Sequence, residues 1–113
     1  MALDPETRDQ LIDTVRRFVT ERLRPLEAQV AEDDAVPDDV VAEMRDLGLF
    51  GLSIDPEYGG LGLTMEEECL VAIELGRTSP AFRSVFGTNV GIGSQGLAMF
   101  GTEDQKRRYL PAI

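Results

Sequence analysis

The glycine-rich segment from Gly91 to Gly96 is the first part of this sequence whose residue types and spacing suggest chemistry. It reads Gly-Ile-Gly-Ser-Gln-Gly and matches the G-x-G-x-x-G pattern that cradles the pyrophosphate of a dinucleotide. That function requires a strand before the pattern, a helix after it and an acidic residue about 20 positions later. Residues 85–90 could form the strand, but Gly101 leaves only a short helix, and no second strand follows. We favour small residues on a tightly packed helix and keep dinucleotide binding as an alternative.

Carboxylates are abundant, but none of them lies in a pattern that predicts catalysis or metal binding. The aspartate pairs at 33–34 and 38–39 lack the alternating acids, central glycine and distal glutamate of a calcium loop. The glutamates at 66–68 are expected on an exposed helical turn, where no apolar pocket would raise a pKa. The chain has no histidine, and its serines have no neighbouring base. We therefore predict no catalytic, cofactor-binding or metal-binding residue in this chain.

Composition excludes several classes of partner. The 113 residues include 21 acidic and 11 basic ones, so the formal net charge is −10, and we expect no nucleic-acid binding. The arginines at 16, 17, 22 and 24 are expected on a solvated helix face. Cys69 is the single cysteine and is expected to be a small buried residue. No leader-like segment and no apolar run of transmembrane length is visible, so we expect no membrane span and a cytoplasmic protein.

The first 34 residues predict one kinked helix. Asp4 is a candidate N-cap, and Pro5 suits the first helical position. Apolar residues then recur at spacings of three and four, which is typical of one buried helix face. They are Ile12, Val15, Val19, Leu23, Leu26 and Val30. Because this register continues past Pro25, we predict a kink there rather than two separate helices.

The remaining residues predict four further helices and one apolar loop. A helix from Pro37 should bury Val40, Met44 and Leu47 and end at Gly48. The loop 49–63 contains large apolar residues that must be buried, and the alternation of Phe50, Leu52 and Ile54 allows a short extended piece.

Two capping boxes, Thr64 with Glu67 and Thr102 with Gln105, begin the third and fifth helices. Met65, Cys69, Ala72, Ile73 and Gly76 are expected on one side of the third helix. The fourth helix should run from 79 to about 100, and its glycines predict close packing against the backbone. The predicted fold is all-α, a five- to six-helix up-and-down bundle forming one domain over 1–113.

Three co-linear segments resemble the acyl-CoA dehydrogenase family. The first spans 47–54 and 56–63, Leu-Gly-Leu-Phe-Gly-Leu-Ser-Ile followed by Pro-Glu-Tyr-Gly-Gly-Leu-Gly-Leu. The second is Glu-Leu-Gly-Arg-Thr-Ser-Pro-Ala at 74–81, and the third is Phe-Gly-Thr-Glu-Asp-Gln-Lys-Arg-Arg-Tyr-Leu-Pro at 100–111. Pro25 also falls where the long first helix of the family often has a proline. The likeness covers essentially the whole chain and points to the N-terminal helical domain.

The resemblance implies a larger enzyme that carries FAD and removes hydrogens from the α and β carbons of acyl-CoA thioesters. Its middle β domain, its C-terminal helical domain and its glutamate base would lie beyond Ile113. Electrons would leave to an electron-transferring flavoprotein, and the parent would be a homo-oligomer. The N-terminal domain would form one wall of the acyl-chain pocket, and we place that wall on Ser84, Val85, Thr88 and Ile92. This chain alone would be inactive and would bind no FAD.

A free-standing helical interaction module is the alternative from another functional class. A module built for independence should cover its own apolar loop and helix faces, whereas a domain of a larger enzyme should expose them.

Overall fold

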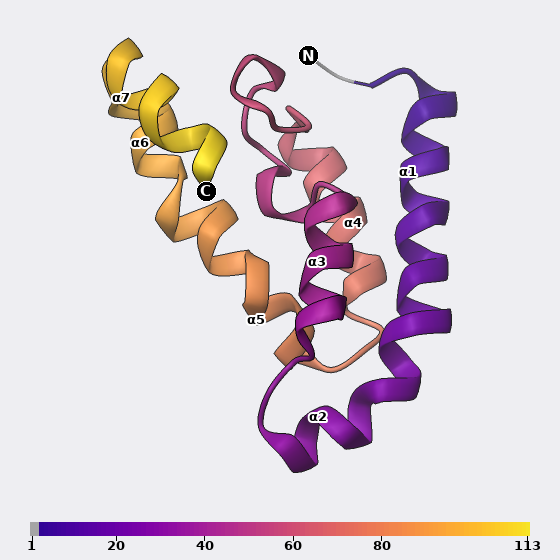
Figure 1. Cartoon of the computed structure of the whole chain (residues 1–113). Helices are drawn as coiled ribbons and strands as arrows, with labels where there is room; N and C mark the ends of the chain where they lie inside the picture. Colours follow the sequence, from indigo (N-terminus) through magenta and orange to yellow (C-terminus); the bar gives the residue numbers. More distant parts are fainter. Residues whose placement is uncertain (1–2) are drawn as a thin grey trace.

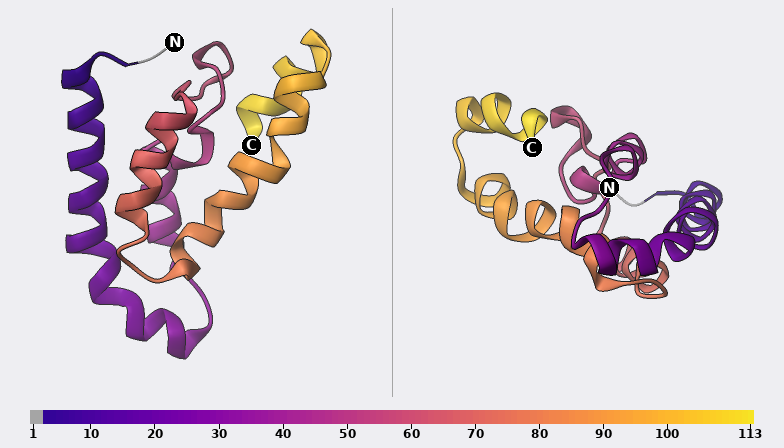
Figure 2. Two further views of the ribbon diagram at one scale, coloured as in Figure 1. Left: turned by 180° about the vertical axis from the view of Figure 1, so that it is seen from behind. Right: turned by 60° about the horizontal axis from the view of Figure 1, so that its bottom comes forward.

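Seven α-helices make up the computed structural model, which describes residues 3–113. They are α1 (Pro5–Phe18), α2 (Glu27–Asp33), α3 (Asp38–Asp46), α4 (Met65–Leu75), α5 (Pro80–Thr88), α6 (Gln95–Phe100) and α7 (Glu103–Tyr109). Figures 1 and 2 show α1 along one side, α3 and α4 in the middle, and α5 with α6 along the other side. No strand occurs within residues 3–113, so the predicted all-α class is confirmed.

The first helical rod, which runs from α1 to α2, agrees closely with the prediction from the sequence. The Asp4 carboxylate accepts a hydrogen bond from the Thr7 N–H at 3.3 Å, and Pro5 occupies the first turn. A π turn over Val19–Leu23 and a 3₁₀ turn over Arg24–Leu26 join α1 to α2. Pro25 lies in that 3₁₀ turn, where its missing N–H and fixed φ interrupt regular α geometry. The predicted kinked helix is therefore confirmed.

Two wide helical turns, Val19–Leu23 and Asn89–Gly93, share a cause in the spacing of buried residues. The buried rows repeat every four positions: Val15, Val19 and Leu23 in one rod, and Phe82, Phe86, Val90 and Ser94 in the other. An α-helix has 3.6 residues per turn, so a repeat of four drifts about 40° around the axis at each step. A π turn holds more residues and offsets the drift. Both rows therefore keep facing the core.

The loop between α3 and α4 buries its apolar residues, as expected. Gly48 ends the α3 region with φ +83, and Leu49, Leu52, Ile54 and Leu63 are all buried. The loop forms 3₁₀ turns at Leu49–Gly51 and Pro56–Tyr58, so the extended piece suggested by alternation is wrong. Backbone hydrogen bonds fold the loop onto itself, and the amide of Leu63 donates to the carbonyl of Leu52 at 2.8 Å.

Helix α4 is rotated relative to the sequence-based expectation. Met65 is 74% exposed and Ile73 59% exposed, and Cys69 is also exposed, so the predicted buried side faces outward. The buried side chains are instead Glu67, Val71, Glu74 and Leu75. The apolar residues of α4 itself point to several sides of the helix, so their spacing in the sequence does not identify the buried face. Two of the four buried positions are glutamates, which a hydrophobic pattern passes over.

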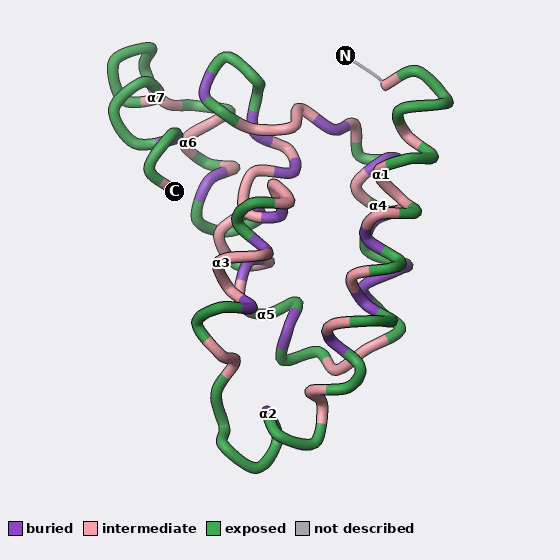
Figure 3. Tube along the Cα trace, turned by 45° about the vertical axis from the view of Figure 1, so that its right-hand side comes forward, coloured by how far each residue is buried: buried purple, intermediate pink, exposed green. Residues whose placement is uncertain are grey.

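The core follows the inner faces of α1, α3, α4 and α5. Its buried members come from all helices except α6 and α7, and Figure 3 shows buried positions, in purple, recurring along the tube of α1, α3, α4 and α5. Ile54, Tyr58 and Leu110 form a second, smaller cluster beneath the C-terminal turns. The principal extents are 43, 32 and 18 Å, so the molecule is a flat slab of helices.

Candidate functional site

The rod that carries the predicted acyl wall is interrupted rather than continuous. Ser79 caps α5, its Oγ accepting from the Ala81 N–H at 3.3 Å, and Pro80 occupies the first turn. The π turn Asn89–Gly93 follows α5, and Ser94, with φ −112°, separates it from α6. The predicted helix over 79–100 is therefore present but divided, with a π turn and Ser94 between α5 and α6. The row Phe82, Phe86 and Val90 holds the rod against the core.

The four predicted wall residues lie on this rod with different exposures. Ser84 and Thr88 are exposed, and Ile92 is 86% exposed in the π turn. Val85 is half-buried and packs against the main core. The Ser84 hydroxyl donates to the Pro80 carbonyl at 3.0 Å. Ser84 also borders a cavity of about 350 Å³ between the α2–α3 link and the start of α5. The structure thus leaves three of the four side chains on the outer surface of the rod.

The glycine pattern at Gly91–Gly96 does not form a dinucleotide cradle. It runs through the π turn into α6, with helix α5 before it instead of a strand, so the alternative of a Rossmann site is wrong. The close packing expected from the glycines is also absent among the described residues. A Cβ added at Gly91 or Gly96 would meet no atom within 4 Å, one at Gly93 would make an ordinary contact with the Thr88 carbonyl at 3.4 Å, and the nearest atoms to one at Gly87 belong to the Arg83 side chain.

A groove between α4 and α5 is the feature that sequence reasoning missed. It has a volume of about 90 Å³, and Leu52, Phe86 and Val90 contribute apolar lining. Glu68 from α4 and Arg83 from α5 also border the groove. The rotation of α4 forms one side of it, because Ala72 faces the groove and not the core. The sequence pattern contains no signal for this groove, because the glycines near it, Gly87 and Gly91, predict close packing instead.

Comparison with known proteins decides what this helical slab is. The family model for the acyl-CoA dehydrogenase N-terminal domain matches residues 5–113, nearly the whole chain. The chain belongs to the acyl-CoA dehydrogenase family. The resemblance drawn from the three sequence segments is therefore confirmed.

Individual relatives give the same result. The mouse very long-chain specific acyl-CoA dehydrogenase is 32% identical over 104 residues, which is 92% of this chain and 16% of that protein. A Bacillus anthracis acyl-CoA dehydrogenase solved with FAD is 30% identical with a TM-score of 0.78, covering 97% of this chain and 20% of that one. A chain from a structure of the electron transferring flavoprotein of Acidaminococcus fermentans has a TM-score of 0.85 and 26% identity, covering 100% of this chain and 30% of that one. The chain thus spans a third or less of each of these proteins.

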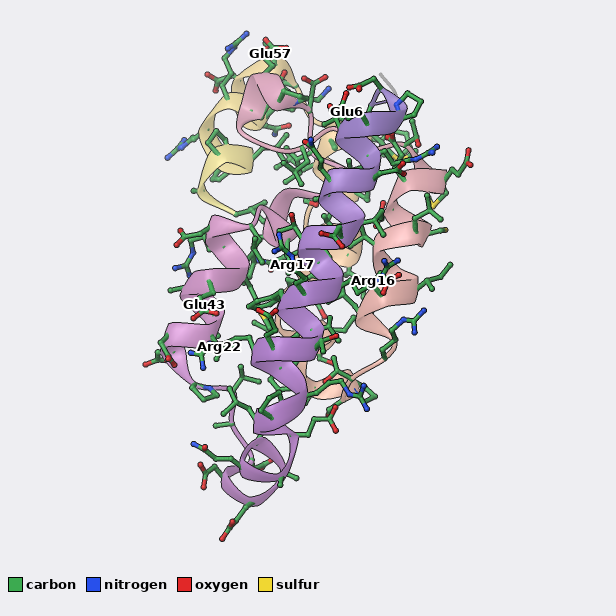
Figure 4. All side chains as sticks on the ribbon, turned by 90° about the vertical axis from the view of Figure 1, so that its right-hand side faces the viewer. Glu6, Arg16, Arg17, Arg22, Glu43 and Glu57 are labelled. Carbon is green, nitrogen blue, oxygen red and sulfur yellow. The ribbon has the colours of Figure 1, made fainter. Side chains whose placement is uncertain are left out.

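Two buried glutamates fix the position of α4 in this acyl-CoA dehydrogenase N-terminal domain. Glu74 is 4% exposed, and its Oε1 accepts from Arg16 of α1 at 3.0 Å. Its Oε2 lies 3.1 Å from Nε of Arg77 but has no hydrogen bond. The hydrogen bond from Arg16 lowers the pKa of Glu74, although burial opposes it. Figure 4 shows Arg16 on the side of α1 that faces α4. The carboxylate stays ionised and ties the two helices together.

Glu67 binds the backbone of Leu3, and its burial corrects the expectation that the acidic turn 66–68 is exposed. It is buried, and its two carboxylate oxygens accept from the backbone N–H of Thr64 at 2.9 Å and of Leu3 at 2.7 Å. These hydrogen bonds, with that from Thr64 the stronger influence, lower the pKa of Glu67. The glutamate of the α4 capping box therefore also holds the backbone of Leu3 against the bundle.

The arginines expected on a solvated face also include Arg17, which makes an exposed ion pair with Asp13, and Arg22 in the following π turn, which is half-buried. Arg22 bridges to Asp39 at 2.6 Å and to Glu43 at 2.9 Å on α3, and Figure 4 shows Arg22 and Glu43 side by side. Within residues 3–113 no three His, Cys, Asp or Glu side chains gather as a metal site. None of the helices in that range is both long and apolar enough to span a bilayer.

Proposed function

We propose that this domain forms one wall of the acyl-chain pocket in a longer, FAD-dependent acyl-CoA dehydrogenase. Ser84, Val85, Thr88 and Ile92 are the wall residues, and the reaction is the α,β-dehydrogenation of an acyl-CoA thioester. The base and the flavin belong to the remainder of that enzyme. The contribution of this domain is to set the shape and polarity of the space that the acyl chain occupies.

The exposure of Ile92 carries this proposal. Ile92 is a large aliphatic side chain and is 86% exposed, whereas the opposite side of its rod is packed in the core. This exposure favours the interpretation that the surface around Ile92 is covered in the complete enzyme. Thr88 and Ser84 extend the same exposed surface toward the start of α5. These side chains are small or mid-sized, which leaves room for a long or bulky acyl group.

We assign no flavin contact to residues 3–113. The glycine pattern lies in helices, and the described residues hold no strand–turn–helix phosphate cradle that would fit the flavin pyrophosphate. The Bacillus anthracis relative was solved with FAD, which supports FAD as the cofactor of the complete enzyme. An electron-transferring flavoprotein as electron acceptor and a homo-oligomeric parent are further parts of the proposal.

Bulky substitutions in the full-length parent enzyme test the wall. Thr88→Trp and Ile92→Trp should lower kcat/KM for long acyl-CoA substrates far more than for short ones, because the added ring fills only the space that a long tail needs. Ala28→Trp is the matched control, since Ala28 is exposed on α2 and outside the proposed wall. It should leave kcat/KM unchanged at every chain length.

Flavin content separates pocket effects from damaged folding. A uniform loss of kcat/KM at every chain length, or a loss that follows reduced flavin content, would refute the assignment of these residues.

A free-standing interaction module is not favoured. The family match extends over residues 5–113, and the exposed Met65 and Ile73 leave the outer side of α4 uncovered within the described chain. A module adapted to independence would bury or replace such side chains.

A further inference from the structure

The C-terminal residues 95–113, hereafter the C-terminal flap, pack as a unit separate from the main bundle. The flap comprises α6, α7 and a final 3₁₀ turn at Leu110–Ala112. Leu110 is its buried apolar anchor, and it packs on Ile54 and Tyr58 of the α3–α4 loop. These residues form a cluster distinct from the core that joins α1, α3, α4 and α5. Figures 1 and 2 show α7 folded back beside the upper end of the rod.

Ser94 provides a fixed point at the base of the flap. The Ser94 side chain is fully buried, and its Oγ donates to the Val90 carbonyl at 2.9 Å. Ser94 also ends the π turn, so the regular hydrogen-bond pattern of the rod is broken where the flap begins. Gly93 and Gly96 on either side remove side chains that would resist a change in backbone direction. The flap is thus attached to the bundle through a break in the rod, and next to this break the Gln95 side chain donates to Ser53 Oγ of the α3–α4 loop at 2.6 Å.

A polar clamp holds the far end of the flap. The Tyr58 hydroxyl donates to the Glu103 carboxylate at 2.9 Å, and burial raises the pKa of Tyr58, which keeps its proton available for donation. Arg107 lies 2.6 Å from Glu57 and 2.8 Å from Glu103, with its guanidinium 5.9 Å from the centre of the Tyr58 ring. Tyr58 and Glu57 belong to the loop, whereas Glu103 and Arg107 belong to α7.

The space under the flap is incompletely filled. A cavity of about 180 Å³ lies between the α3–α4 loop and the final residues, bordered by Phe50, Tyr58, Leu110 and Ile113. Most of α7 is exposed, and Leu110 is the one buried residue among the described residues 95–113 of the flap, with Leu97 and Ile113 packed partly against the same cluster, so few apolar contacts resist release of the flap. A segment with little buried apolar surface opens at a lower free energy than the core of its domain.

We propose that the C-terminal flap is a strap that opens as a unit about Ser94, that the Tyr58–Glu103 clamp holds it closed, and that the main bundle stays folded while it opens. Opening uncovers Ile54, Tyr58 and the cavity beneath Leu110. The hinge at Ser94 directly follows Ile92 and Gly93. A movement of the flap would therefore also change the backbone of the π turn that carries Ile92.

Hydrogen exchange of the 113-residue chain, followed by mass spectrometry of peptides, tests this proposal. Tyr58→Phe removes only the hydroxyl that bonds Glu103, so amides of α7 should exchange about tenfold faster. Amides of α1 and α4 should keep their rates. Arg107→Gln, an exposed change with little effect on packing, should accelerate the same peptides. Tyr109→Phe is the matched control, because Tyr109 lies on α7 itself and its hydroxyl makes no hydrogen bond within residues 3–113.

Three results would overturn the proposal. Unchanged exchange of α7 in Tyr58→Phe would show that the clamp does not hold the flap. Equal acceleration throughout the chain, or loss of protection everywhere, would show that α7 opens only with the whole domain. An effect of Tyr109→Phe as large as that of Tyr58→Phe would attribute the change to the ring environment of α7 and not to the clamp.

Discussion

Replacing Arg16 should destabilise the domain more than replacing its partner Glu74. The two side chains share a 3.0 Å hydrogen bond, but their surroundings differ greatly. The Glu74 side chain is 5% exposed and that of Arg16 is 53% exposed. Arg16→Met therefore leaves a buried carboxylate with only Arg77 nearby, whereas Glu74→Gln leaves a guanidinium that water can solvate.

The expected magnitudes follow from this asymmetry. Losing a charged hydrogen-bond partner from a buried group costs about 2 kcal/mol in the free energy of unfolding, so we assign that value to Arg16→Met. Glu74→Gln keeps the shape of the side chain and an oxygen acceptor, and about 1 kcal/mol is expected. Arg17→Met is the control. Arg17 and Asp13 are paired at 3.4 Å and are both more than half exposed, so a change within about 0.5 kcal/mol is expected.

Urea denaturation followed by far-UV circular dichroism measures these differences, and repeating it across pH adds a second test. The folded pKa of Glu74 is lowered from the ordinary value of 4.5. Its stabilising contribution is therefore fully present above that pH and is lost as the pH falls through the lower folded pKa. The wild type should lose part of its advantage over Glu74→Gln in that acidic range. A cost for Glu74→Gln equal to or larger than that for Arg16→Met would refute the reasoning.

Two further predictions concern the loop and the isolated chain. Gly60→Ala should destabilise the domain by at least about 2 kcal/mol, because the new Cβ would lie 2.1 Å from the backbone oxygen of Ile54. Gly59→Ala, at φ +93 with open space around it, should cost only about 1 kcal/mol; equal urea midpoints for the two variants would contradict this. The purified 113-residue chain should bind no stoichiometric flavin and show no dehydrogenase activity. An equimolar flavin absorbance would count against the proposal that the flavin is bound by the remainder of the enzyme.

Local signals in the sequence predicted the helix boundaries well. Asp4, Pro25, Gly48 and the capping box at Thr64 all act where their chemistry requires, because caps, prolines and glycines depend on nearby backbone. The buried face of α4 could not be predicted in the same way. Glu74 is buried only because Arg16 arrives from a helix 58 positions earlier, and no local pattern contains that partner.

The sequence predicted the rod that carries the candidate wall residues but not the shape of that rod, and their role as an acyl wall stays a prediction. The spacing of Ser84, Thr88 and Ile92 placed them on one rod, and the structure keeps them exposed. The π turn that carries Ile92 depends on how four-residue repeats meet the core, which is a property of the packed bundle.

The flatness of the slab has a consequence for surface area. A monomeric protein of 12.4 kDa is expected to expose about 6,100 Å² by the usual scaling with mass. This domain exposes 6978 Å², an excess of roughly 850 Å² over that scaling. One partner in a standard protein interface contributes about 800 Å². The slab is 18 Å thick, and its surface exceeds that of a compact protein of the same mass by about the area that one partner contributes to an interface. Such a shape is typical of a domain whose broad face is covered by another domain or subunit.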